Sequence, residues 1–91
     1  MSRMSGYTQS VTWDPANILS NAAASVEVTV PGAVLGDFAL ASFSLDVADL
    51  TLTADVTAAN TVTVVLANDS GGAVNLGSGT LRVKVVPYDV I

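Results

Sequence analysis

The chain has 91 residues, of which 51% are hydrophobic and 12% charged, and it carries a net charge of −5 with only three basic side chains. This length allows one domain with a modest core, and the negative charge argues against nucleic acids and anionic membrane surfaces as partners. The sequence contains no histidine and no cysteine, which removes the commonest general base, metal ligand and nucleophile. We therefore expect no enzymatic activity, no catalytic residues, no bound metal and no cofactor.

The first seven residues show no hydrophobic periodicity, so we expect a flexible N-terminal arm over 1–7 and a single domain over 8–91. A first strand is predicted over 8–13 and ends at Asp14-Pro15. Aspartate followed by proline can begin a helix, here through 17–19. The small residues of 20–25 carry no apolar stripe, which favours an irregular connection over that helix.

Five further runs alternate between apolar and polar residues, the period of a strand with one buried and one solvated face. They are 25–30, 38–47, 49–58, 61–67 and 80–86. Pro31-Gly32 and Gly36-Asp37 mark turns, and Ala59-Asn60 is predicted to form a tight hairpin. In 38–47 the alternation changes phase, which indicates a bulge near Ser42 or a strand covered on both faces.

Short strands rich in valine and threonine, separated by turn residues, predict an all-β fold. We expect a small antiparallel sandwich or barrel of about six strands, Ig-like or jelly-roll-like. The period of two also predicts which side chains form the common core. They are Val26, Val28, Val30, Val62, Val64, Leu66, Leu81, Val83 and Val85.

Acidic residues raise the question of a calcium site, since Asp46, Asp49 and Asp55 lie close in sequence and Asn68-Asp69 lies on a predicted loop. Calcium needs several oxygen ligands on a regularly spaced loop, and no such pattern is present. Glu27 and Asp55 could share one solvated face, as a carboxylate pair would. The scarcity of aromatic residues argues against a glycosidase, so we interpret the carboxylates as solvated.

Three other motifs have simple structural interpretations. The glycines of 71–79 resemble a phosphate-binding loop in composition, but no P-loop lysine accompanies them, so a hairpin loop is favoured. Asn68-Asp69-Ser70 matches a glycosylation acceptor, which we interpret as a chance match because no secretory signal is visible. Trp13 is predicted to be the largest buried side chain rather than an exposed binding aromatic.

Several segments resemble small structural proteins of tailed-bacteriophage virions. The resemblance covers most of the chain from Ser10 and rests on strand-and-turn patterns. These patterns are Ser10-Val11-Thr12-Trp13-Asp14-Pro15, the stretch 28–37, Ala58-Ala59-Asn60-Thr61-Val62-Thr63-Val64, the loop 68–72 and Gly79-Thr80-Leu81-Arg82-Val83.

The resemblance implies a component of the assembled particle, made in the cytoplasm of a bacterial host. We expect a capsid decoration (cement) protein on the outside of the head, with the major capsid protein and further copies of itself, as a homotrimer, as partners. A head-fibre or tail component, with the capacity to bind carbohydrate, is the alternative. Outward-facing Trp13, Tyr7 or Tyr88 would favour that alternative.

Overall fold

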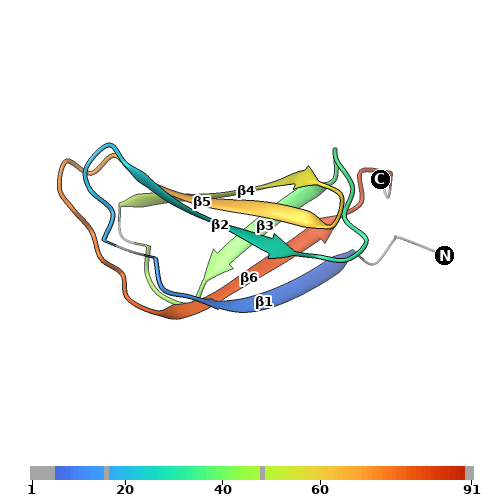
Figure 1. The fold of residues 1–91 in the computed structure, drawn as a ribbon, viewed down its shortest axis with the longest axis horizontal. Helices are drawn as coiled ribbons and strands as arrows, with labels where there is room; N and C mark the ends of the chain where they lie inside the picture. Colours follow the sequence, from blue (N-terminus) through green and yellow to red (C-terminus); the bar gives the residue numbers. More distant parts are fainter. Residues whose placement is uncertain (1–5, 16, 48, 90–91) are drawn as a thin grey trace.

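The computed structural model describes residues 6–15, 17–47 and 49–89, which form two facing antiparallel sheets and contain no helix (Figure 1). The strands are β1 (Tyr7–Trp13), β2 (Ala23–Thr29), β3 (Phe38–Phe43), β4 (Leu50–Ala58), β5 (Thr61–Asn68) and β6 (Gly79–Val86). This confirms the predicted all-β fold of six strands. Within the described residues the strands form a sandwich of two separate sheets and not one closed barrel. The sandwich has fewer strands than an immunoglobulin domain or a jelly roll.

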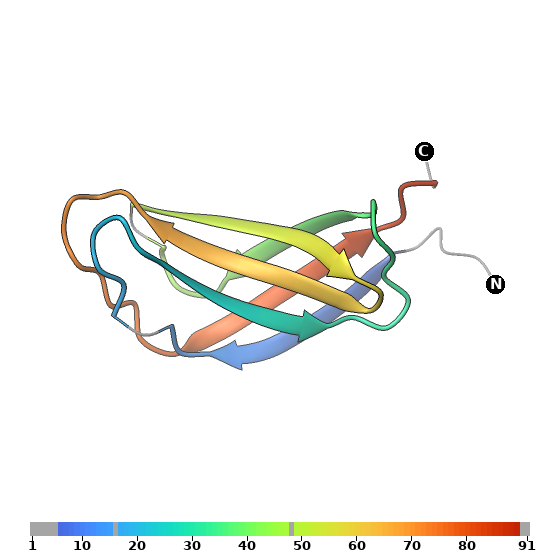
Figure 2. The same ribbon diagram turned by 45° about the horizontal axis from the view of Figure 1, so that its top comes forward.

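Each sheet is built around one central strand. In the first sheet β6 lies between β1 and β3, and in the second β5 lies between β2 and β4. Figure 2 shows the second sheet lying across the first. Every pairing is antiparallel, so each strand can bury one face and leave the other to solvent.

The predicted burial is confirmed, and all the predicted residues except Leu66 share one core. The predicted valines and leucines of β5 and β6 are almost fully buried between the sheets, as are Val28 and Val30, while Val26 is half-buried and packs against the core. Leu66 is equally buried but belongs to a second cluster. On the same strands, Thr29 and Lys84 face outward and are exposed. A shift of one residue would exchange these two sets of side chains, so the hydrophobic pattern specifies the register.

A second, smaller core cluster closes one end of the sandwich. It consists of Ile18, Leu50 and Leu66, with Trp13 packed between it and the main core. Ile18 reaches this position in an extended backbone that forms a bridge with Val74, with hydrogen bonds of 2.8 and 2.9 Å. The helix considered for 17–19 is therefore wrong. The irregular connection predicted over 20–25 is confirmed for 20–22 only, because β2 begins at Ala23 and not at Ser25.

The third strand is shorter than predicted. β3 ends at Phe43 instead of Val47, and its register with β6 runs without a bulge from Phe38 to Phe43. Both explanations of the broken alternation are wrong, because residues 44–47 belong to the following connection and Phe38 and Leu40 point into solvent. The bulge of this structure lies in β4, between Val56 and Ala58.

Smaller corrections concern the ends of the elements. β1 begins at Tyr7, which the prediction assigned to the N-terminal arm, and Tyr7 pairs with Val85 of β6. Of the remaining residues of the predicted arm, Gly6 is described, and residues 1–5 lie outside the described residues. The hairpin between β4 and β5 has the predicted two-residue link, with Asn60 at a φ of 62°. Asparagine tolerates this left-handed conformation better than most residues.

Candidate functional site: the two outer sheet faces

The outer face of the β1-β6-β3 sheet is cationic. Arg82 and Lys84 are exposed on the central strand β6, and the strands of this sheet contain no acidic residue. The register places Arg82 between Ser10 and Ser42, and Lys84 between Thr8 and Leu40. A shallow hollow of about 230 Å³ runs over these side chains. We call this surface the cationic face.

Large apolar side chains adjoin the cationic face. Phe38 is 51% exposed and Leu40 is 60% exposed, both on the outward side of β3, while Leu35 and Tyr88 are 64% and 54% exposed beyond the end of the sheet. A Cβ placed on Gly36 would lie 3.8 Å from the Tyr88 ring, so Tyr88 lies against the turn that carries Leu35. We call Leu35, Phe38, Leu40 and Tyr88 the apolar patch.

The buried carboxylate of Asp37 holds this end of the molecule together. Its Oδ2 accepts a hydrogen bond from the Val34 backbone N–H at 3.0 Å, and its Oδ1 accepts one from the Tyr88 N–H at 3.1 Å. The turn before β3 and the segment after β6 are thereby joined across 51 residues of sequence. Asp37 therefore acts as a structural residue that positions Leu35 and Tyr88.

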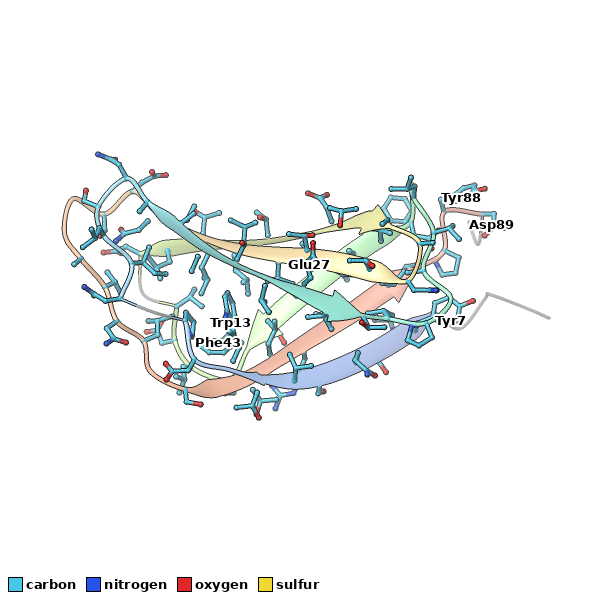
Figure 3. All side chains as sticks on the ribbon, viewed as in Figure 1. Tyr7, Trp13, Glu27, Phe43, Tyr88 and Asp89 are labelled. Carbon is cyan, nitrogen blue, oxygen red and sulfur yellow. The ribbon has the colours of Figure 1, made fainter. Side chains whose placement is uncertain are left out.

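The opposite outer face, on the β2-β5-β4 sheet, is acidic. Glu27 on β2 and Asp55 on β4 both pair with Thr63 of the central strand, so the three residues form one row across the sheet. Two strand spacings separate the carboxylate-bearing backbones by about 10 Å. The prediction that Glu27 and Asp55 share a solvated face is confirmed, and Figure 3 labels Glu27 on β2. We call this surface the acidic face.

The acidic face does not resemble a hydrolytic site. Its neighbouring side chains are small, with the Thr57 and Thr63 hydroxyls 2.8 Å apart, and Glu27 and Asp55 lie on an open sheet surface. A glycosidase holds its two carboxyl groups on either side of a sugar bound in a cleft. Glu27 and Asp55 stand on an exposed sheet surface instead.

The residues considered for calcium are not brought together. Asp46 and Asp49 lie in the connection between β3 and β4, whereas Asp55 lies on the acidic face. Among the described residues there is no group of three or more aspartate, glutamate, histidine or cysteine side chains that could hold a metal ion.

Asn68, the candidate glycan acceptor, is buried. Its Nδ2 donates hydrogen bonds to the carbonyls of Ile18 at 2.7 Å and Gly72 at 2.8 Å, and its Oδ1 accepts from the backbone N–H and the hydroxyl of Ser70. With both donor hydrogens used and only 1% of the residue exposed, Asn68 is unavailable for glycosylation in the folded protein. It is instead a structural residue of the 68–72 loop.

The glycine-rich segment is a loop and not a phosphate-binding site. The predicted hairpin is wrong, because β5 and β6 lie in different sheets and the loop connects one sheet to the other. Gly71 and Gly77 have φ angles of 88° and 83°, a conformation that glycine adopts readily. Val74 between them bridges to Ile18, and the segment leads into β6. A phosphate-binding loop would lead into the N-terminus of a helix.

The aromatic residues are divided between interior and surface. Trp13 is half-buried and meets Phe43 edge to face, with ring centroids 5.9 Å apart, between the sheets (Figure 3). Tyr7 is also half-buried, against Gly32. Of the three aromatics whose exposure would favour carbohydrate binding, only Tyr88 is exposed. The prediction that Trp13 is the largest buried side chain is wrong, because Trp13 is only half-buried; it packs against both core clusters instead of standing exposed.

The comparisons with known proteins identify no relative of this chain. A scan against protein-family models, a search of curated proteins and a search of solved structures each give no significant match. The described part of the chain also has no helix that is long and apolar enough to cross a membrane.

Proposed function

We propose that this chain is a non-enzymatic structural protein of a tailed-phage virion, a decoration protein that binds the outside of the head as a homo-oligomer. The observation that carries the proposal is the apolar patch. Its four large apolar side chains are each more than half exposed, and a cluster of exposed apolar side chains marks a binding site for another protein. The sequence resemblance to virion proteins supplies the class of assembly.

The two outer sheet faces agree with this role. Neither presents an enclosed site, and each is a broad, gently curved surface of the kind that packs against another protein. With no cysteine for a disulfide and a core confined to two small clusters, the domain gains stability from association. The net charge of −5 makes direct contact with packaged DNA unfavourable, which agrees with a position outside the shell.

The N-terminal segment is proposed to contribute to attachment. Since β1 begins at Tyr7, the part that can be removed without cutting the sheet is residues 2–5, and a deletion of 2–10 would remove half of β1. Fixing the backbone of a residue costs about 1–2 kcal/mol, so an attachment role requires this segment to gain contacts with the capsid that offset that cost. We expect a 2–5 deletion to fold normally and to bind heads more weakly.

The test is to add the purified protein to heads of the encoding phage that lack it, and to image the particles by electron cryomicroscopy. The proposal is supported if the wild-type protein gives density outside the shell and a Leu35→Ser/Tyr88→Ser variant that still folds gives none. A Leu19→Ser variant is the control, because Leu19 is 61% exposed outside the patch. Density on the tail or on a fibre would support the alternative location, and binding to neither would overturn the proposal.

A further inference from the structure

We infer that copies of this chain associate face to back, with the cationic face of one copy on the acidic face of the next. The inference rests on the self-association in the proposed function and assigns a surface to it. The partner is therefore a second copy of the same chain. Its recognition groups are Arg82 and Lys84 on one side and Glu27 and Asp55 on the other.

Charge segregation between the two sheets is the first argument. Arg82 and Lys84 are the basic residues of the described part of the chain, and both lie on the cationic face. The strands β2, β4 and β5 contain Glu27 and Asp55 and no basic residue. A two-fold contact between like faces would place like charges together, whereas a face-to-back contact pairs opposite charges.

Shape is the second argument. Phe38 and Leu40 project from the cationic face at its β3 edge. The acidic face is lined by short side chains, which leave room for them. Its outward residues include Ser25, Thr53, Thr61, Thr63, Val65 and Ala67. The half-buried Val65 and Ala67 provide an apolar surface on which Phe38 and Leu40 can be covered. Leu35 and Tyr88, beyond the end of the sheet, are then the part of the apolar patch left for the head.

The positions of the charges also define an orientation. Arg82 and Lys84 lie two residues apart along one strand, about 7 Å, whereas Glu27 and Asp55 lie across three strands, about 10 Å apart. The long arginine and lysine side chains span this difference. Both charge pairs can form together only when the facing strands cross at a steep angle, as in orthogonal sheet packing.

A face-to-back contact is heterologous, because it joins two different surfaces. Such contacts repeat from copy to copy and produce either a closed ring or a growing stack, never a two-fold dimer. Because the two faces lie on opposite sides of the sandwich, successive copies continue in one direction, so a stack replaces the homotrimer expected from the sequence.

The central experiment uses two variants, Arg82→Glu/Lys84→Glu and Glu27→Lys/Asp55→Lys, in sedimentation velocity runs over a range of concentrations at low salt. The wild-type protein should associate with increasing concentration. Each variant alone should associate at least tenfold more weakly, because both of its faces then carry the same sign of charge. Circular dichroism checks that each variant is folded.

An equimolar mixture of the two variants should associate again. The second variant keeps Arg82 and Lys84, and the first keeps Glu27 and Asp55, so one native contact can form between them. Both variants remain net negative, so attraction between overall charges cannot produce this result. The control is Asp14→Lys/Asp69→Lys, which changes net charge as much as the second variant at exposed sites outside both faces. It should associate like the wild type.

Carbodiimide cross-linking maps the contact directly. Lys84 is the only lysine of the chain, so an intermolecular amide between Lys84 and Glu27 or Asp55, identified by mass spectrometry, would report the proposed pairing. A protein that stays monomeric at every concentration, a two-fold dimer, or a mixture that fails to associate would overturn the inference. If the protein binds heads but its copies do not associate face to back, only this inference is overturned. If its copies associate face to back but the protein does not bind heads, only the proposed function is overturned.

Discussion

The side-chain amide of Asn68 donates a hydrogen bond to the backbone carbonyl of Ile18 at 2.7 Å, across 50 residues of sequence. Ile18 belongs to the irregular connection between β1 and β2, and Asn68 is the last residue of β5. Together with the bridge between Ile18 and Val74, this bond attaches two long connections to one end of the sandwich. It also lets Ile18 complete the smaller core cluster.

We expect Asn68→Ala to lower the free energy of unfolding by about 1–3 kcal/mol, because the substitution removes the hydrogen bonds of the buried Asn68 side chain to the Ile18 and Gly72 carbonyls and to the Ser70 N–H. The Ile18 carbonyl then keeps only its bond from the Val74 N–H. Urea denaturation followed by Trp13 fluorescence measures the change. Asn75→Ala is the matched control, since the Asn75 side chain accepts one exposed bond from Gly77 at 3.2 Å. Equal losses for the two variants would contradict the role assigned to Asn68.

Gly32 is a position at which both the backbone conformation and the neighbouring side chain require glycine. Its φ is 98°, and a Cβ there would lie 2.9 Å from the Tyr7 ring. Gly32→Ala should therefore destabilise the fold by roughly 1–3 kcal/mol, through backbone strain and displacement of Tyr7. Gly72→Ala, with open space around its Cβ, should change stability little. Thermal unfolding compares them, and an unchanged midpoint for Gly32→Ala would refute this account.

Leucines with opposite exposure test the register of the sheets. Leu66→Ala and Leu81→Ala remove fully buried side chains, so each should cost about 2–5 kcal/mol of stability. Leu40→Ala, on the outward side of β3, should stay within about 0.5 kcal/mol of the wild type. Chemical denaturation measures all three, and a large loss at Leu40 would mean that β3 is turned over.

Two N-terminal deletions should separate the segment before β1 from the sheet. Removing residues 2–5 should leave the thermal midpoint unchanged. Removing 2–10 eliminates the pairing of Tyr7, Thr8, Gln9 and Ser10 with β6, and the half-buried Tyr7 ring with it. We expect the longer deletion to lose more than about 1.5 kcal/mol. Circular dichroism melting curves distinguish the two, and equal stability would show that the first half of β1 contributes nothing.

Most of the sheet structure could be predicted because its residues alternate strictly. In 61–67 and 80–86 every second residue is a valine or leucine, and burial follows that alternation. The pattern breaks down at β3. The inward side of β3 is filled by Ala39 and Ala41, and alanines give a weak signal beside the outward Phe38 and Leu40. The hydrophobic effect does not require a surface leucine to be buried.

The charge separation between the sheets could not be predicted from single strands. Glu27 and Asp55 are 28 positions apart in sequence, and only the shared pairing with Thr63 places them in one row. Likewise, the structural role of Asn68 depends on Ile18, which is 50 residues away in sequence and lies beside it only in the folded chain. Alternation reveals which face a residue occupies, but long-range pairing decides which residues become its neighbours.

The pairing of Tyr7 with Val85 makes β1 and β6 adjacent, so the polypeptide enters and leaves the sandwich at the same end (Figure 1). A protein engineer could therefore graft residues 6–89 into a surface loop of a host protein with short linkers, because the host's two cut ends need not be pulled apart. The same adjacency suits circular permutation, with the old ends joined and new ones opened in the hairpin at Ala59 and Asn60. The loops at the opposite end, around Asp69 and Gly71, would then point away from the host and could display an inserted peptide.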